Sequence, residues 1–315
     1  MRIAFAGTPA VAVPSLELLA GSAVHQVVAA ITRPDAKAGR GRHTRPSAVA
    51  LTAQRLGLET LKPAHPREPD FQRRLKELAL DAVAVVAYGA LIPDNALAIP
   101  KHGWINLHFS LLPAWRGAAP VQRAIEHGDD ITGATTFQIV KALDAGPVYG
   151  YLTYRLPPRA TSGEVLDTLA VDAAPLLVRT LDAIADGSAR PEVQNDGEAT
   201  YAHKLTSEGA EVKFDRPAAA VDRLIRACTP EPGAWCRFRG RQLGLGPVTI
   251  GPDQSGQAEH HPELAPGQLL ATKRAVWVGT ATAPVALGQV APAGKTAMDA
   301  ADWARGQRLT AEDVL

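Results

Sequence analysis

The sequence predicts an α/β protein in which a mostly parallel sheet, covered by helices on both faces, is followed by a small C-terminal β-barrel. Three patterns carry this prediction. Up to about residue 186, short apolar runs alternate with helical segments, as in parallel sheets that are buried on both faces. Residues 187–197 are rich in Gly, Pro and Asn, which is typical of a linker. Beyond them, short strands alternate with turn residues, as in a small barrel or sandwich.

The N-terminal half begins with an apolar strand that runs into Gly7-Thr8-Pro9. The strands expected there occupy residues 2–6, 25–32, 81–88, 104–109, 132–140 and 148–156. The helices expected there occupy residues 10–19, 46–56, 71–80 and 120–127, and a long helix runs to about residue 186. Pro46 suits a first helical turn, because proline lacks the N–H that such a turn leaves unpaired. Thr161 and Glu164 have the spacing of a capping box that opens the long helix.

The turn Gly7-Thr8-Pro9 after the first strand invites comparison with nucleotide-binding loops. That turn has no G-x-G-x-x-G pattern, and the chain has no Walker A pattern, so dinucleotide binding is weakly supported. A tight strand-to-helix turn and a ligand contact both remain open for this segment.

The C-terminal part supplies a second domain. Its expected strands occupy residues 234–239, 242–245, 267–271, 275–279 and 285–290. We therefore expect a first domain at residues 1–187, a linker at residues 188–205 and a second domain at residues 206–315. For a chain of 315 residues, two domains are also the ordinary expectation.

Composition excludes several classes of protein. No apolar run reaches the roughly 18 residues that a transmembrane helix needs, and the apolar N-terminal stretch is too short for a signal peptide. Cys228 and Cys236 fit a reducing compartment, and their spacing matches no zinc site. We therefore expect a cytoplasmic protein without a bound metal, in which both cysteines are structural. No long exposed apolar edge is evident in the sequence, so we expect a monomer.

A net charge of +1 hides two basic regions. Residues 31–45 hold one acidic residue, Asp35, and five basic ones: Arg33, Lys37, Arg40, Arg42 and Arg45. Residues 201–245 hold a second and more mixed set of charges. Both regions are compatible with a polyanionic partner. For the second region, an ordinary solvated surface with interspersed charges is the favoured alternative.

The most informative segment is residues 103–120, GWINLHFSLLPAWRGAAP. Asn106 and His108 lie two residues apart in an apolar strand, so their side chains point to the same face. An acyl-transfer site uses an amide donor and a titratable imidazole to stabilise an oxyanion and to move a proton. Asp144, in the turn-rich KALDAGP segment, is our candidate for orienting the imidazole. Taken alone, Asp144 is also typical of an ordinary turn, and His108 of a buried core histidine.

Together these segments resemble the methionyl-tRNA formyltransferase family. The resemblance rests on residues 103–120, on FAGTP at 5–9, on TRPDAKAGRGR at 32–42, on LDAGP at 143–147 and on residues 203–205, 211–215 and 225–234. It implies a Rossmann-like catalytic domain and an OB-like C-terminal barrel that binds tRNA. It also implies transfer of a formyl group from the cosubstrate 10-formyltetrahydrofolate to methionine on initiator tRNA.

Matched residue by residue, the resemblance gives roles to three groups of residues. Its catalytic residues fall on Asn106, His108 and Asp144. Its folate-binding residues fall on Ser110, Leu111, Leu112 and Pro113, with the wall of a pterin pocket around Tyr88, Gly89, Leu91 and Ile92. Its tRNA-binding residues fall on Arg40, Gly41, Arg42 and Arg45. The chain departs from the family at His43, where a further Lys or Arg is common.

The acceptor of the formyl group is less firmly indicated than the chemistry. The Asn-His-SLLP motif with a downstream Asp is shared by all formyltransferases that use 10-formyltetrahydrofolate, so it does not distinguish their acceptors. The basic segment and the C-terminal part favour tRNA. The alternatives are formylation of an amino sugar or a nucleotide precursor, hydrolysis of formylfolate, and nucleic-acid binding with an inactive cleft.

Overall fold

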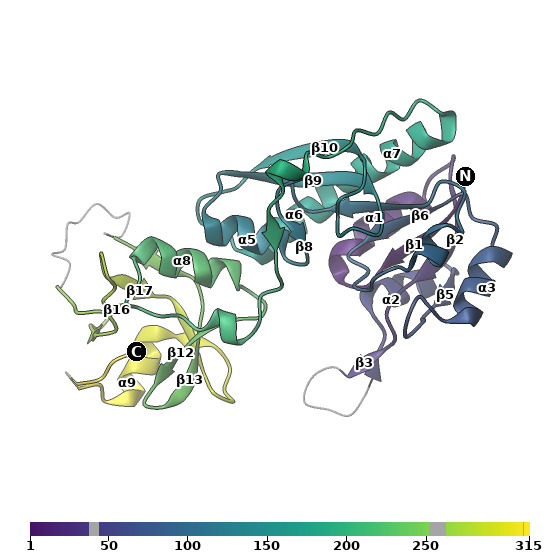
Figure 1. Cartoon of the computed structure of the whole chain (residues 1–315). Helices are drawn as coiled ribbons and strands as arrows, with labels where there is room; N and C mark the ends of the chain where they lie inside the picture. The colour runs from purple at the N-terminus through teal and green to yellow at the C-terminus, as the bar shows by residue number, and fades with distance from the viewer. Residues whose placement is uncertain (38–43, 252–262, 311) are drawn as a thin grey trace. The chain divides into compact units, whose positions relative to one another are not determined.

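The computed structural model describes residues 1–37, 44–251, 263–310 and 312–315 (Figure 1). The described chain divides into two compact units. The first unit contains Met1–Pro120, Ile131–Arg155 and Leu166–Ala202, and the second contains Val121–Asp130, Leu156–Val165 and His203–Leu315. Two segments from before residue 166 therefore belong with the C-terminal residues, and each unit is discontinuous in sequence. The domain boundaries expected near residues 187 and 205 stay a prediction.

A seven-stranded sheet forms the centre of the first unit. In spatial order its strands are β10 (Val148–Arg155), β9 (Ile131–Gln138), β7 (Trp104–His108), β6 (Ala82–Val86), β1 (Arg2–Gly7), β2 (Gln26–Ile31) and β5 (Glu59–Leu61). Strand β9 runs antiparallel to β7 and β10, and the other neighbouring pairs are parallel. The chain moves outward from β1 through β2 and β5, then returns to the other side of β1 as β6. This reversal creates a topological switch point at the carboxyl ends of β1 and β6, where open α/β sheets bind ligands.

Helices cover this sheet on both faces, as the sequence predicts. One face packs against α3 (Pro69–Glu77) through a single apolar cluster that includes Ala4, Ala6, Phe71, Leu75, Val83 and Val85. Ile3 and Phe5 are fully buried and point to the opposite face, because side chains alternate along β1. On that face α1 (Val13–Ala20) contacts both α2 (Ala48–Arg55) and α7 (Ala174–Asp186). The short apolar strands are therefore buried from both sides.

The helices of the first half differ from the expectation in several details, and a short helix, α4 (Asp94–Leu97), is not expected from the sequence at all. The expected long helix is two helices, α6 (Ser162–Asp172) and α7, which are separated at Ala173 because Pro175 lacks a backbone donor for the helix. Ser47 caps α2 by accepting a hydrogen bond from the N–H of Ala50 at 3.0 Å, so Pro46 precedes the cap. A first 3₁₀ turn, Ala10–Ala12, precedes α1. The capping box is confirmed: Glu164 Oε2 accepts from the N–H of Thr161 at 2.8 Å.

The second unit is built on two antiparallel sheets of four strands each. One sheet contains β12 (Ala234–Phe238), β13 (Arg241–Leu245), β18 (Gln289–Pro292) and β19 (Met298–Asp299). The other contains β14 (Val248–Ile250), β17 (Val285–Leu287), β16 (Val276–Val278) and β15 (Leu269–Ala271). The single strand expected at residues 285–290 is therefore two strands, one in each sheet. Helices α8 (Ala218–Ala227) and α9 (Ala300–Gln307) accompany them and are not expected from the sequence.

The two cysteines of the second unit are buried and free. Burial raises the pKa of Cys228 to about 11 and the pKa of Cys236 to about 12. Both thiols are therefore protonated near neutral pH and poor nucleophiles. No helix in the described parts of the chain combines the length and the apolar character that crossing a membrane requires.

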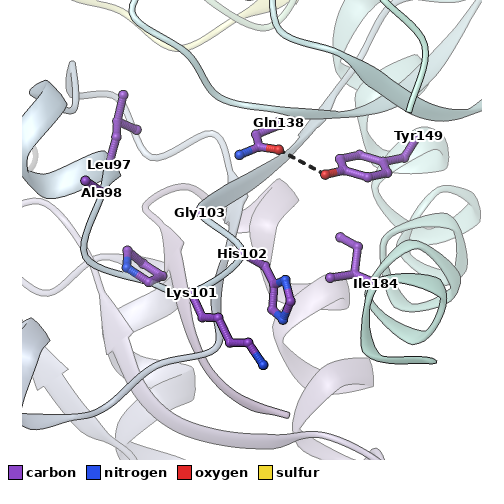
Figure 2. Close-up of a pocket in the computed structure, with 9 residues that line it drawn as sticks. Leu97, Ala98, Lys101, His102, Gly103, Gln138, Tyr149 and Ile184 are labelled. Carbon is purple, nitrogen blue, oxygen red and sulfur yellow. Dashed lines mark hydrogen bonds between the residues drawn. The ribbon is translucent and has the colours of Figure 1, made fainter. Parts of the chain in front are cut away.

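Two cavities of the first unit lie at the starts of parallel strands. One, of about 430 Å³, lies before β7 and is lined by Lys101, His102 and Gly103 among others (Figure 2). The other, of about 650 Å³, is lined by Arg2 and Gln26 at the starts of β1 and β2. Both cavities therefore lie at the amino ends of the parallel strands, whereas the switch point lies at their carboxyl ends.

Candidate active site

Strand β7 places Asn106 and His108 on one face of the sheet. Asn106 lies opposite Val85 of β6. His108, the last residue of the strand, lies opposite Thr135 of β9. Because side chains alternate along a strand, Asn106 and His108 point to the same face, as the sequence predicts. His108 is buried, with 6% of its surface exposed, whereas Asn106 is partly exposed.

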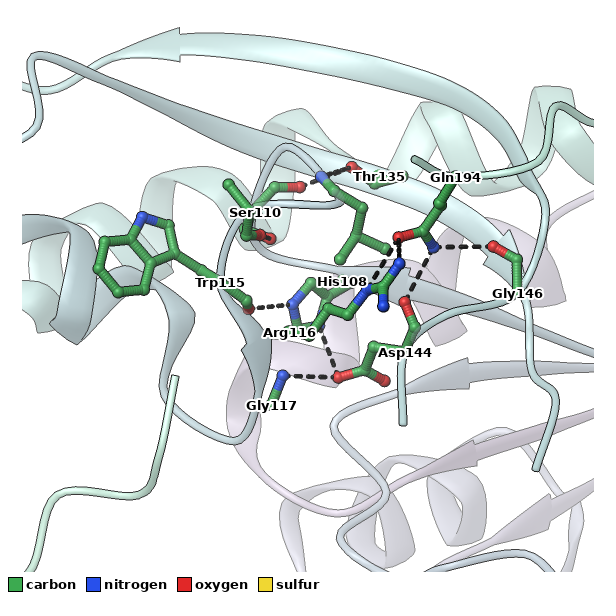
Figure 3. A network of polar contacts seen from close by, with 11 residues as sticks. His108, Ser110, Trp115, Arg116, Gly117, Thr135, Asp144, Gly146 and Gln194 are labelled. Carbon is green, nitrogen blue, oxygen red and sulfur yellow. Dashed lines mark hydrogen bonds and ion pairs between the residues drawn. The ribbon is translucent and has the colours of Figure 1, made fainter. Parts of the chain in front are cut away.

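The imidazole of His108 is held in one orientation. Its Nε2 lies 2.9 Å from the carbonyl oxygen of Trp115. Because a carbonyl oxygen can only accept, Nε2 carries the proton of that hydrogen bond. The ring of His108 meets the ring of Phe137 edge-on, with centroids 6.3 Å apart and planes at 88°. Nδ1 faces Asp144, whose Oδ2 is 4.0 Å away (Figure 3), so Nδ1 is the ring nitrogen left for chemistry.

Asp144 reaches His108 from a distant strand end. It lies in the β9–β10 connection, residues 139–147, which begins at the other end of β7: the N–H of Ile139 donates to the carbonyl oxygen of Trp104 at 2.8 Å. From the sequence we expect Asp144 simply to follow a strand end, but β9 is antiparallel to β7, so that end lies away from His108. The connection turns back along β7. Asp144 has φ +48°, a left-handed conformation that Asp tolerates better than most residues.

The carboxylate of Asp144 accepts a main-chain hydrogen bond. Its Oδ2 lies 2.7 Å from the N–H of Gly117. The same oxygen is 4.0 Å from Nδ1 of His108, which is an ion-pair distance and too long for a hydrogen bond. Catalytic hydrogen bonds are often long before the substrate binds. The structure therefore brings Asp144 to His108 without closing a direct hydrogen bond between them.

Two residues that sequence reasoning missed hold this arrangement. The side-chain amide of Gln194 donates to the carbonyl oxygens of Asp144 and Gly146, both at 2.8 Å. Its Oε1 accepts from Nε and Nη2 of Arg116, at 3.0 and 2.8 Å (Figure 3). Arg116 had a signal, since it is a charged residue inside the apolar LLPAWRG segment. Gln194 had none, because it lies in the segment that looks like a linker.

The residues after His108 form a loop whose polar groups bond within it and to β9. Ser110 Oγ donates to the carbonyl oxygen of Ala114 at 2.6 Å. Thr135 Oγ1 donates to the carbonyl oxygen of Ser110 at 2.6 Å and accepts from the N–H of Leu112 at 3.1 Å. The side chains of Ser110 and Leu112 are buried, and those of Leu111 and Pro113 are partly buried. The expected folate-binding role of these four residues stays a prediction.

The residues after β6 lie at the switch point. The carbonyl oxygen of Tyr88 accepts a hydrogen bond from Thr8 Oγ1 at 2.9 Å, which joins the segments that follow β1 and β6. The Tyr88 side chain is buried in the apolar cluster under α3, and this burial raises the pKa of Tyr88 to about 12. Ile92 is partly buried against the same cluster. Gly89 is exposed and Leu91 is 79% exposed, so these two are the expected pocket residues with free surface.

Most of the expected tRNA-binding residues lie outside the described part of the chain. Arg40, Gly41 and Arg42 belong to residues 38–43, which the structure does not describe. Arg45 is described and exposed on β4 (Thr44–Arg45), which pairs with β3 (Ala36–Lys37). Among the described residues no group of three or more His, Cys, Asp or Glu side chains is arranged to hold a metal.

Family models match both parts of the chain. Residues 1–181 match the family described as formyl transferase, and residues 204–308 match the formyl transferase C-terminal domain. Among solved structures, a variant of HypX from Aquifex aeolicus has a TM-score of 0.68 at 18% identity, covering 97% of this chain and 47% of that longer chain. A methionyl-tRNA formyltransferase from Clostridium thermocellum has a TM-score of 0.57 at 14% identity, covering 81% of this chain and 95% of that one. At these identities the likeness shows the fold.

Closer relatives match over the full length. The methionyl-tRNA formyltransferase of Thermobifida fusca is 60% identical over 309 residues, which is 98% of this chain and 97% of that one. The methionyl-tRNA formyltransferase of Salinispora tropica is 55% identical over 315 residues, the whole of both chains. Together with a sheet that sets an amide, an imidazole and a carboxylate around one strand end, this similarity shows that the chain belongs to the methionyl-tRNA formyltransferase family.

Proposed function

We propose that this chain transfers the formyl group from N10 of 10-formyltetrahydrofolate to the α-amine of methionine on initiator tRNA. One observation carries the proposal. His108 Nδ1 lies 4.0 Å from the Asp144 carboxylate, on the face of β7 that also carries Asn106. A neutral amine that attacks the formyl carbon needs a donor for the oxygen that becomes negative and an acceptor for the proton that it loses.

Asn106 supplies the first donor in this proposal. Its partly exposed side-chain amide would donate a hydrogen bond to the formyl oxygen as negative charge builds there. A single donor of this kind typically contributes a factor of about 10²–10³ to the rate, or about 3–4 kcal/mol. The adjacent ladder partners, Val85 and Phe137, are apolar and buried, so Asn106 is the polar residue between two apolar neighbours on this face.

His108 and Asp144 supply the second donor and the proton acceptor. Since Nε2 keeps its proton on the Trp115 carbonyl oxygen, the imidazolium form of His108 would also carry an N–H on Nδ1, directed toward the reacting carbonyl and Asp144. Asp144 would hold that N–H in line and accept the amine proton, directly or through a water. The bond from the formyl carbon to N10 would then break, and N10 would leave with a proton supplied by His108 Nδ1 or Asp144. The 4.0 Å separation of the two groups leaves space for a water or a substrate atom to contact both.

The segments around the switch point fit a flat, apolar ligand such as a pterin. Ile92, in residues 88–92, packs on the same apolar cluster as Tyr88, and the β9–β10 connection turns back from the far end of β7 to bring Asp144 beside His108. Each segment also exposes an apolar side chain: Leu91 is 79% exposed and Leu143 is 52% exposed. Apolar walls with main-chain polar groups are typical of pockets for planar cosubstrates. The folate would supply the one-carbon group to be transferred.

The expected partner is charged initiator tRNA. Arg45, exposed on β4, and the neighbouring Arg40 and Arg42 would neutralise phosphates and release counterions. We propose a cytoplasmic location, because translation makes the substrate there. We also propose that the chain acts as a monomer, which light scattering coupled to gel filtration would test.

A formylation assay with competing acceptors tests the proposal. Purified chain and 10-formyltetrahydrofolate are offered charged initiator methionyl-tRNA, a nucleotide-linked amino sugar, or water alone. We expect formylation of the tRNA at a kcat/KM at least about 100-fold above the amino sugar, because only the tRNA engages the basic segment. Preferred formylation of the amino sugar, or release of formate with no acceptor, would exclude tRNA as the substrate.

A further inference from the structure

We propose that Gln194 and Arg116 are positioning residues, which keep Asp144 beside His108 and so act on turnover through Asp144. The inference rests on the proposed function of the site and extends it to two residues outside the expected catalytic set. Within the described residues neither side chain forms a hydrogen bond with His108: Gln194 bonds the β9–β10 connection, and Arg116 bonds Gln194.

The connection needs an anchor because of its route. It leaves β9 beside Trp104, at the start of β7, whereas His108 is at the end of that strand. Four residue steps at about 3.3 Å each separate the two positions by about 13 Å. Residues 139–147 contain no helix or strand, so no ladder hydrogen bonds fix the part of the connection that carries Asp144.

Gln194 supplies that anchor through the main chain. Its two amide hydrogens go to the carbonyl oxygens of Asp144 and Gly146, two residues apart, and both distances are 2.8 Å. Gly146 must be a glycine here, because a Cβ would lie 1.7 Å from the carbonyl oxygen of Gln138. Two bonds to one short segment fix its position and its direction, and therefore the direction of the Asp144 side chain.

Arg116 fixes the anchor in turn. Its Nε and Nη2 both donate to Gln194 Oε1, so the amide cannot flip without placing NH₂ against a guanidinium. Arg116 is 3% exposed and Gln194 is 9% exposed, so these bonds are shielded from water. Arg116 also reaches Asp196, whose side chain is 81% exposed. The next residue, Gly117, donates its N–H to the Asp144 carboxylate.

The chemistry of Gln194 makes the inference specific. Both hydrogens and both acceptor positions of its amide are used, a full set for this side chain. Glutamate at this position would keep the partner for Arg116 but would place a carboxylate against two carbonyl oxygens. Methionine would keep the approximate length and would remove all four bonds.

The test compares Gln194→Met and Gln194→Glu with wild type in steady-state formylation of charged initiator tRNA. For both we expect kcat to fall about 10- to 100-fold, because small misplacements of a reacting group are costly, while KM for tRNA and for the folate changes less than about twofold. Gln72→Met is the matched control. The Gln72 amide also bonds a main-chain carbonyl, that of Pro66 at 3.1 Å, far from Asp144 in sequence. It should leave kcat within about twofold of wild type.

A double-mutant cycle separates positioning from general stability. Asp144→Asn keeps the main-chain carbonyl that Gln194 binds and removes the carboxylate. If Gln194 acts through Asp144, adding Gln194→Met to Asp144→Asn lowers kcat by less than about twofold further. A full 10- to 100-fold loss in that background would overturn the inference, since Gln194 would then act by another route.

Hydrogen exchange gives a readout that does not depend on the reaction. A peptide spanning residues 139–147 should exchange at least about tenfold faster in Gln194→Met than in wild type, with unchanged exchange in α3. Unchanged exchange at residues 139–147 would contradict the inference. If the wild-type chain formylates no tRNA but Gln194→Met still exchanges faster than wild type at residues 139–147, the proposed function is contradicted and the anchoring stands.

Discussion

Two segments meet at His108, and they are held in different ways. Residues 109–114 follow His108 directly, and they are held in part by a hydrogen bond between near neighbours in sequence. Ser110 Oγ donates to the carbonyl oxygen of Ala114, four residues on. Residues 139–147 come from the far end of β7, and their anchor, Gln194, is 50 residues beyond Asp144. The site therefore combines His108, whose position follows from its own strand, with Asp144, whose position depends on tertiary contacts.

The difference decides what sequence reasoning can see. The alternation that puts Asn106 and His108 on one face is a property of the strand itself. The approach of Asp144 depends on the antiparallel direction of β9 and on a distant glutamine. Three predictions test this contrast.

The largest effect is expected where a proposed reacting group is removed, either His108 at the end of β7 or Asp144 in residues 139–147. His108→Ala and Asp144→Asn should each lower kcat by at least about 100-fold, because each removes an interaction that the transition state needs. Steady-state kinetics measures this, and thermal unfolding within a few degrees of wild type shows that the fold is kept. Near-normal turnover by either soluble variant would remove that residue from the mechanism.

A smaller effect is expected from a methyl group that pushes on the β9–β10 connection. In Gly146→Ala the new Cβ would meet a main-chain oxygen at 1.7 Å, so the connection must shift. We expect a loss of about 2–4 kcal/mol in the free energy of unfolding and about a tenfold lower kcat. Gly187→Ala is the control, since Gly187 has φ +77° and no atom within 4 Å of the added carbon. That control should lose about 1 kcal/mol and keep its turnover.

The smallest effect is expected from the locally bonded segment. Ser110→Ala removes one hydrogen bond to Ala114 and leaves the Thr135 bonds in place. The free energy of unfolding should fall by about 1 kcal/mol, and kcat by about twofold or less. Denaturant unfolding and kinetics on one preparation measure both. A drop in kcat as large as that of Gly146→Ala would erase the contrast between the two segments.

The fold was predictable from the sequence wherever an element is determined by its own residues. The central strands lie within a few residues of the expected ranges, because each is a continuous apolar run. The orientation of β9 carries no such signature, since its sequence, ITGATTFQ, suits a strand of either direction. The start of helix α9 does carry a sequence signal, the N-cap residue Asp299, which accepts from the N–H of Ala301 at 2.8 Å.

The candidate site was predictable to a similar depth. Asn106, His108 and Asp144 could be named from a motif, because a motif preserves residue types and their spacing. The motif does not predict that the Tyr88 ring is buried in the core. Nor does it predict that the carbonyl oxygen of Tyr88 accepts the hydrogen bond from Thr8. Which side of a backbone faces a cleft depends on packing that no short sequence window contains.

The interleaved make-up of the two units limits how such a chain can be cut or recombined. Residues 121–130 belong to the second unit, where Arg123 donates to the carbonyl oxygen of His203 at 3.0 Å. Residues 156–165 belong there as well, and Ser162 donates to the carbonyl oxygen of Thr229 at 2.8 Å. A fragment that begins after residue 205 lacks both of these segments, residues 121–130 and 156–165. Cutting the chain at that point would therefore separate the C-terminal part from two segments that belong to its own unit.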